Sequence, residues 1–166
     1  TFVFTTQNGN ARGYGAEASA TWAVLPSLML HGSLGLLDTQ IDSWRIRPGV
    51  EGRDLAHAPG YTLNAGVTWY AWAGISTRLD VTAVDEFYFD ISNDQQSSAY
   101  ELVNLRIAKD WDNWSLALWG RNIFDEPYAT RGFFFGNDPS LGFAPELYTR
   151  FGDPRQVGLT LQFNYN

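Results

Sequence analysis

A run of aromatic residues beside an arginine stands out in the last third of the chain. Phe133, Phe134 and Phe135 follow closely on Arg131, within a stretch (124–153) that shows no regular alternation. Exposed aromatic rings can hold a flat ligand by stacking, and an arginine can hold an anion through paired hydrogen bonds. These four residues are therefore candidate ligand-binding residues. The alternative is a loop that folds around its own small core.

A second candidate is a basic cluster in the polar stretch 42–60. Its members are Arg45, Arg47 and Arg53, next to Trp44. In a chain with a net charge of −7, such a cluster predicts contact with an anionic group such as a lipid phosphate. The alternative is that the arginines are solvated and paired with Glu51 and Asp54.

Catalytic and metal-binding patterns are weak. His31 and Ser33 lie two residues apart on one face of an alternating segment, which could form a nucleophile and base. His57 is isolated, and Asp110 and Asp112 fit a tight polar turn better than a calcium loop. The chain has no cysteine, which excludes thiolate metal sites. We therefore expect no enzyme activity, no metal and no cofactor.

Composition points to a chain that does not face water on all sides. Aromatic residues make up 16% and charged residues only 17%, against about a quarter charged in typical domains. No apolar run reaches the ~20 residues that a membrane-spanning helix needs. The pI of about 4.6 makes nucleic acid an unsuitable partner.

Alternation with a period of two dominates the chain and predicts β-strands. The alternating segments are 14–24, 28–36, 61–70, 75–83, 103–108, 114–121 and 156–165, preceded by a short apolar segment, 1–7, and a predicted turn at 8–10. The pattern predicts an all-β chain of about eight antiparallel strands with no helix.

Two features favour a transmembrane β-barrel over a soluble sandwich. Charged residues in the strands fall on the face opposite the apolar one; they are Glu17, Arg78, Asp80, Arg106 and Arg121. Short connections alternate with long ones, as in outer-membrane barrels with short periplasmic turns and long extracellular loops. The short connections are 25–27, 72–74 and 111–113, and the long ones are 42–60, 90–98 and 124–153.

Aromatic residues also gather where the short turns lie, which predicts a girdle at one membrane interface. The predicted girdle comprises Trp22, Trp69, Trp72, Trp111, Trp114 and Tyr165. Tyr14, Tyr61 and Tyr100 lie at the opposite ends of their strands. The alternative is that these are ordinary core aromatics.

The last third of the chain carries two motifs. One runs Asn-Ile-Phe-Asp-Glu-Pro-Tyr over 122–128, and the other runs Tyr-Thr-Arg-Phe-Gly-Asp-Pro-Arg over 148–155 and continues into the final strand. The motif residues are Asn122, Asp125, Tyr128, Gly152, Pro154, Arg155, Gly158 and Phe163. Asn122 and Asp125 suit the capping of backbone groups where a strand ends, and Pro127 stops strand pairing, so we expect a structural role.

These motifs resemble the end of the barrel in TonB-dependent outer-membrane receptors, and segments 52–59 and 100–106 resemble other parts of it. The resemblance implies a barrel of about 22 strands, of which residues 1–166 would be the carboxy-terminal third, without the plug domain. It further implies residence in the bacterial outer membrane, contact with its lipid, and uptake of an extracellular ligand such as a ferric siderophore. TonB would act only through the plug and TonB box, which this chain lacks.

The alternative is a stand-alone eight-stranded outer-membrane barrel, either a structural anchor or an enzyme. The pair His31 and Ser33 is similar to that of an outer-membrane lipid A deacylase. Both residues point away from the apolar face, whereas a lipid-cleaving site should open toward lipid. Segment 1–7 is also shorter than the ~9 residues of a spanning strand, which favours a piece of a larger barrel.

Overall fold

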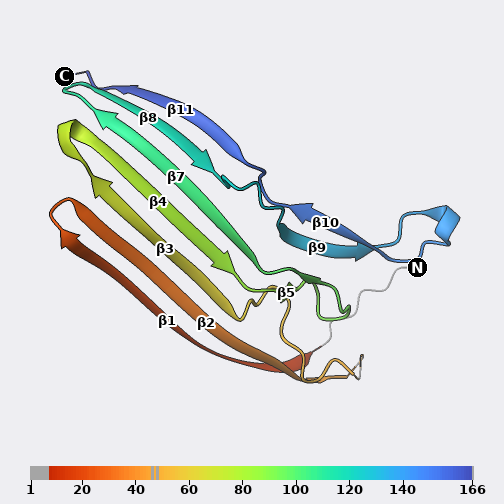
Figure 1. The fold of residues 1–166 in the computed structure, drawn as a ribbon. Coiled ribbons are helices and arrows are strands. Elements are labelled where there is room, and N and C mark those ends of the chain that lie inside the picture. Colours follow the sequence, from red (N-terminus) through yellow and green to blue (C-terminus); the bar gives the residue numbers. More distant parts are fainter. Residues whose placement is uncertain (1–7, 46, 48, 166) are drawn as a thin grey trace.

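The computed structural model describes residues 8–45, 47 and 49–165. Its main feature is a seven-stranded sheet with the order β1-β2-β3-β4-β7-β8-β11 (Figure 1). These strands are β1 (Gly9–Leu25), β2 (Leu28–Trp44), β3 (Tyr61–Tyr70), β4 (Ile75–Val84), β7 (Tyr100–Asp110), β8 (Trp114–Arg121) and β11 (Gln156–Phe163). The remaining elements are β5 (Phe87–Tyr88), β6 (Gln96–Ser97), β9 (Ala129–Phe135), β10 (Glu146–Phe151) and the 3-10 turns η1 (Trp72–Gly74) and η2 (Pro139–Leu141).

Neighbouring strands of the main sheet are antiparallel, and their register separates two faces. Leu79 lies opposite Leu105 on one face, whereas Arg78 lies opposite Arg106 on the other. Because side chains alternate along a strand, these two pairs determine on which face each remaining residue of β4 and β7 lies. We call the two sides the apolar face and the polar face.

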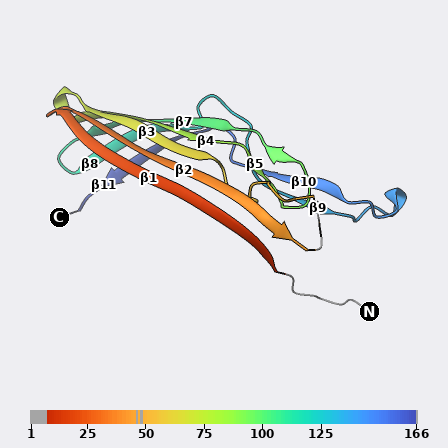
Figure 2. The same cartoon turned by 90° about the horizontal axis from the view of Figure 1, so that it is seen from below.

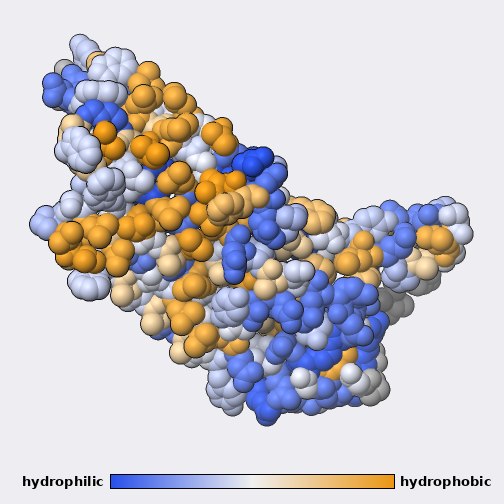
Figure 3. Space-filling view, viewed as in Figure 1, coloured by the Kyte–Doolittle hydropathy of each residue, from blue (hydrophilic) through white to orange (hydrophobic). Residues whose placement is uncertain are grey.

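The sheet forms one curved layer, and the apolar face is largely uncovered by the described residues (Figures 1 and 2). Leu159 and Leu118, both on this face, have exposed fractions of 66% and 52%. Figure 3 shows apolar side chains gathered over the strands and hydrophilic ones over the long connections. A contiguous exposed apolar face is typical of a surface that contacts lipid or another protein.

The ends of the sheet differ. The turn end carries the short connections, and the loop end carries the long ones. The loop end contains a small core of buried side chains from β2, the following loop and the β5 region: Ile41, Val50, Phe87 and Phe89. Among the described residues, no helix has the length and apolar character needed to cross a membrane.

The all-β antiparallel fold and the short turns predicted from the sequence are confirmed, and the helical elements among the described residues are limited to the three-residue 3-10 turns η1 and η2. The predicted turn at 8–10 is also wrong, because Gly9 and Asn10 belong to β1 and lie opposite Trp44 and Ser43. A register shift after Asn10 accommodates these turn-prone residues without ending the strand. The predicted strand 1–7 lies outside the described residues.

The long connections contain more structure than the alternation predicts. β2 continues to Trp44, well beyond residue 36, because β1 supplies hydrogen-bond partners along this whole length. The predicted loop 124–153 contains the hairpin of β9 and β10, and the loop near 90–98 contains β6.

Candidate ligand-binding loops and polar face

Two of the arginines after β2 are held by the loop between β4 and β7. Arg47 donates to the backbone oxygen of Ser92 (2.9 Å). Arg53 donates to the backbone oxygen of Asn93 and pairs with Asp94 (3.0 Å). The alternative, pairing with Glu51 and Asp54, is therefore wrong for these two arginines. Glu51 instead accepts from the backbone of Gly49, and Asp54 accepts from Thr39.

Arg53 is more enclosed than its sequence context suggests. Its side chain is only 15% exposed, and its guanidinium lies 4.3 Å from the centre of the Tyr88 ring. A desolvated arginine stacked on an aromatic ring is held in one orientation. Arg53 therefore joins the two loops, while Arg45 and Arg47 remain exposed.

A turn centred on Asp90 presents the carbonyls that these arginines contact. Asp90 accepts from the backbone N–H groups of Ser92 (2.5 Å) and Asn93 (2.8 Å) and from the Asn93 side chain (2.7 Å). Burial raises the pKa of Asp90, but the hydrogen bonds from Asn93 and Ser92, with the charge of Arg47, outweigh burial and lower it overall. The ionised carboxylate therefore stabilises the turn.

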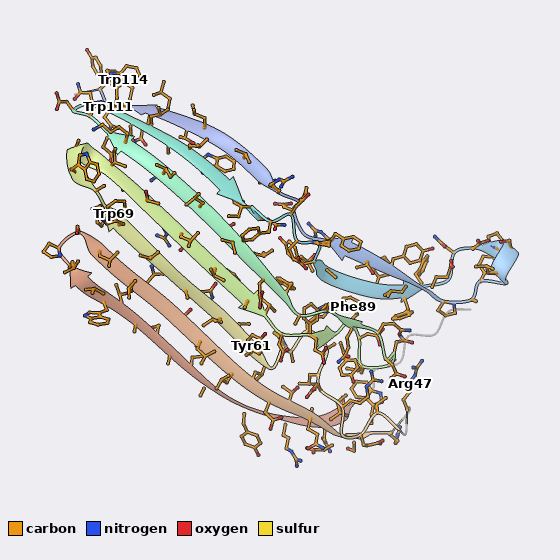
Figure 4. All side chains as sticks on the ribbon, viewed as in Figure 1. Arg47, Tyr61, Trp69, Phe89, Trp111 and Trp114 are labelled. Atoms are coloured by element: carbon orange, nitrogen blue, oxygen red, sulfur yellow. The ribbon has the colours of Figure 1, made fainter. Side chains whose placement is uncertain are left out.

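The loop end also contains His57, whose ring lies 5.3 Å from that of Phe87. Phe87 in turn packs edge-on against Phe89. Figure 4 shows Phe89 and Arg47 at this end of the sheet. The small apolar core thus packs beneath the surface of the arginine-bearing loops and stabilises them. Among the described residues, no group of three or more His, Cys, Asp or Glu side chains is arranged to hold a metal.

The hairpin of β9 and β10 places the four candidate residues Arg131, Phe133, Phe134 and Phe135 on two faces. Arg131, Phe133 and Phe135 alternate with Gly132 and Phe134 along β9, so Phe134 lies on the opposite face. The exposed fractions of Phe133 and Phe135 are 51% and 56%. Phe134 is less exposed than either.

Across the hairpin, residues of β10 extend the face that carries Phe133. Tyr148 lies opposite Phe133, with their rings stacked at 5.6 Å, and Arg150 lies opposite Arg131. The Tyr148 hydroxyl is within 2.5 Å of the Asn137 side-chain oxygen. We call Arg131, Phe133, Phe135, Tyr148 and Arg150 the hairpin face. Sequence reasoning missed Tyr148 and Arg150 as ligand candidates, because their proximity depends on the strand register.

On the polar face of the main sheet, His31, Arg78 and Asp80 form a connected cluster. Arg78 Nε lies 2.8 Å from Asp80 Oδ2, and His31 Nε2 lies 2.9 Å from Asp80 Oδ1. Ser33 instead lies within 3.5 Å of the Asn64 amide. No hydrogen bond joins Ser33 to His31 within the described part of the chain, so the arrangement does not give the nucleophile-to-base contact that catalysis needs.

The motif that begins at Asn122 ends β8 at the loop end of the sheet. Asn122 has a positive φ of 47° and is only 4% exposed. Its amide nitrogen donates to the backbone oxygens of Glu126 (2.9 Å) and Asp153 (3.2 Å), and its amide oxygen accepts from Glu126 N–H (2.9 Å). Asp125 accepts from the backbone N–H of Arg155 (2.7 Å). These bonds fasten the end of β8 to the start of β11.

Two aromatic residues complete this junction. Tyr128 lies 4.7 Å from Tyr100, ring centre to ring centre, and directly over Gly152, where any side chain would overlap its ring. Pro154 follows in the same connection, while Gly158 and Phe163 lie on β11. The motif residues thus connect the main sheet to the β9–β10 hairpin.

The residues of the predicted girdle are all substantially exposed. Figure 4 shows Trp69, Trp111 and Trp114 at the turn end and Tyr61 toward the loop end. Trp69 packs edge-on against Trp72 (6.4 Å), and Trp114 packs against Phe163 (4.6 Å). Trp22 lies close to the β1–β2 turn, and Tyr165 follows the end of β11.

Comparison with known proteins shows which family has this architecture. A family model described as "TonB dependent receptor-like, beta-barrel" matches residues 1–123. The chain is similar to the ferric yersiniabactin uptake receptor FyuA from Yersinia pestis, with a TM-score of 0.81 and 19% identity, covering 95% of this chain and 24% of that one. It is similar to the siderophore receptor PiuA from Acinetobacter baumannii, with a TM-score of 0.79 and 16% identity, covering 95% and 22%.

A third similar structure is the ferric-catecholate import receptor Fiu from Escherichia coli K12. Its TM-score is 0.72 and its identity 17%, covering 96% of this chain and 22% of that one. This chain therefore spans less than a quarter of the length of each of these receptors. At such identities the likeness shows the fold alone.

Proposed function

We propose, from the premise that this chain belongs to the TonB-dependent receptor-like β-barrel family, that it forms the carboxy-terminal part of an outer-membrane uptake receptor. Members of this family are outer-membrane β-barrels. The complete protein would take up an extracellular ligand such as a ferric siderophore. A plug domain and TonB box outside residues 1–166 would make the contact with TonB.

The observation that carries this proposal is the one-layered sheet with opposite faces. Its apolar face is exposed, as lipid contact requires, and its polar face carries the charged side chains. Among the described residues, β1 and β11 each pair on one side only, so further strands could close the wall. A barrel removes such open edges.

We further propose that the loop end captures the ligand. Arg45 and Arg47 offer positive charge, and the hairpin face offers stacked aromatic rings flanked by Arg131 and Arg150. The two sets lie on separate elements, so one ligand would contact them together only by bridging the loop end.

The test is iron uptake by cells that carry the complete gene. Under iron limitation, deleting the gene should abolish growth on one ferric chelate in a panel, and deleting tonB should have the same effect. Phe133→Ala combined with Arg131→Gln should weaken ligand binding while leaving the protein in the outer membrane. A protein absent from the outer-membrane fraction, or growth that is unaffected by both deletions on every chelate, contradicts the proposal.

A further inference from the structure

A single lysine interrupts the apolar face at the turn end of the sheet. Lys109 is the only lysine in the chain, and it lies on the same side of β7 as Leu105 and Ile107. Its register partners in the neighbouring strands are apolar, Ile75 in β4 and Leu116 in β8. A charge on a face that contacts lipid is costly unless it reaches a polar layer or an anion.

The Lys109 ammonium is directed toward the turn end. Its Nζ lies 5.6 Å from the centre of the Trp111 ring, and a Cβ added to Gly74 in η1 would lie 3.6 Å from the same Nζ. Trp111 is held in the β7–β8 turn, because its backbone N–H donates to the backbone oxygen of Trp114 (2.8 Å). Long basic side chains extend in this way to bring their charge to the head-group layer of a membrane.

The surrounding side chains show which part of a lipid would lie here. Trp111 and Trp114 are 52% and 46% exposed, and both lie at the turn end (Figure 4). Tryptophan rings prefer the membrane interface, where the ring contacts acyl chains and its N–H contacts head groups. Ile107 is exposed one step further from this end, on the same face. A lipid phosphate at Lys109 would therefore have its acyl chains against Ile107.

No carboxylate neutralises Lys109 in the described part of the chain. The ion pairs found there do not include it, and Asp110 alternates onto the polar face. β4 and β8 flank β7 on its two sides, so strands that complete a barrel would not lie beside Lys109. A plug domain would fill the opposite, polar side. The ammonium, which has three donors, therefore faces the membrane.

We propose that Lys109 and Trp111 bind an anionic phospholipid of the inner leaflet, with its phosphate at Lys109 Nζ. Charge complementarity selects the head group. The phosphate of phosphatidylglycerol keeps its negative charge, whereas that of phosphatidylcholine is offset by the cation of the same head group. The inference rests on the proposed function, since it requires that the apolar face contacts lipid and that the turn end lies at the periplasmic interface.

The test measures which lipid lies beside Lys109 in the complete protein, reconstituted in phosphatidylcholine vesicles. A bimane fluorophore attached to Ile107→Cys reports on this site, and small fractions of dibrominated phosphatidylglycerol or dibrominated phosphatidylcholine quench it on contact. The association constant should be about fivefold larger for phosphatidylglycerol, the ratio expected for one lysine near an anionic lipid. This ratio should fall toward one as salt is raised to about 1 M.

A second probe and three variants give the controls. Bimane at Leu30→Cys, on the same face of β2 near its own turn, should show no preference between the two lipids. In the Ile107→Cys protein, Lys109→Gln should reduce the ratio to about one, and Lys109→Arg should retain it, because both cations bind phosphate. Arg12→Gln removes a charge from the loop end of the apolar face, where Arg12 pairs with Asp42, and should leave the ratio unchanged.

Equal association of the two lipids at Ile107→Cys overturns the proposal, as does an equal preference at Leu30→Cys or a preference that persists in Lys109→Gln. Heat-modifiable migration on gels shows whether each variant is folded, and the salt dependence tests the proposal with Lys109 in place. Probes that neither brominated lipid quenches would overturn the lipid contact itself, and with it the barrel orientation. Failure of the uptake proposal alone would leave the lipid preference intact while deletion of the gene changed no chelate uptake.

Discussion

Asn122 is the residue on which the loop-end boundary of β8 depends most. It is buried, its side chain satisfies backbone groups at Glu126 and Asp153, and its own backbone N–H donates to Asn104 (3.0 Å). Asn122→Ala should destabilise the protein by about 1–3 kcal/mol, because it leaves these part-buried backbone groups without partners. Thermal unfolding of the complete protein in detergent, followed by heat-modifiable migration, measures the loss.

Asn113→Ala provides the comparison for this variant. Asn113 lies exposed in the β7–β8 turn, where its backbone oxygen accepts a hydrogen bond from the backbone N–H of Asn164. A substitution there should change stability by less than about 0.5 kcal/mol. Equal stability of the two variants would show that the Asn122 side chain is dispensable.

Asp90 gives the loop end a defined dependence on pH. Its pKa lies below the ordinary value in the folded protein, so its contribution is present above that ordinary value, about 3.9, and is lost as pH falls through the lowered value. Hydrogen exchange of segment 85–99 should therefore be constant at neutral pH and should accelerate below about pH 4, after correction for intrinsic rates.

The variant Asp90→Asn separates this effect from general acid unfolding. It removes the titrating group, so exchange in 85–99 should be faster at neutral pH and should lack the acid step of the wild type. Segment 61–70, which lies within the sheet, serves as the internal reference. If the wild type and the variant show the same acid step, another group is responsible.

Among the elements, the junction between β10 and β11 depends on a close approach of backbone and ring. The Tyr128 ring covers Gly152 so closely that even a methyl group would overlap it, and Gly152 N–H donates to the backbone oxygen of Tyr128 (2.8 Å). Gly152→Ala should cost about 1–3 kcal/mol through overpacking. In the double variant with Tyr128→Ala, Gly152→Ala should cost much less, and a double-mutant cycle of unfolding measures this difference. Additive costs would contradict the contact.

The elements also show which features can be read from the sequence. The strands of the main sheet are predictable because one face is apolar and the other polar, which produces a period of two in β4 and β7. β9 contains three consecutive phenylalanines, which hide that period, so the sequence does not predict its pairing with β10. Gly9 and Asn10 have the local propensity of a turn, and this propensity carries no information about the partner strand β2.

The loop contacts were less predictable for a related reason. Arg47 and Arg53 contact Ser92, Asn93 and Asp94, which are distant in the sequence. Acidic residues nearer in the chain were the only partners that local reasoning could propose. Long-range pairing is set by which loops the strand order places side by side, and β2, β3, β4 and β7 are consecutive in the sheet.

The whole molecule is a layer with one apolar and one polar side, and lipid contact makes a quantitative prediction about it. Leu159 lies on the apolar face, in the middle of β11. An arginine near the middle of a bilayer costs roughly 2–4 kcal/mol, so Leu159→Arg should lower the free energy of unfolding of the complete protein by this amount. Gln162→Arg introduces the same charge on the polar face of the same strand and should cost less than about 0.5 kcal/mol.

Urea unfolding in lipid vesicles measures both variants, and the folded fraction in outer membranes gives a cellular counterpart. The comparison separates lipid contact from burial against another protein layer. In detergent with short chains, which water penetrates more readily, the cost of Leu159→Arg should shrink, whereas a buried protein interface would keep it unchanged. Equal costs for the two variants in vesicles would mean that the apolar face does not contact lipid, and the barrel orientation on which the receptor proposal depends would then be wrong.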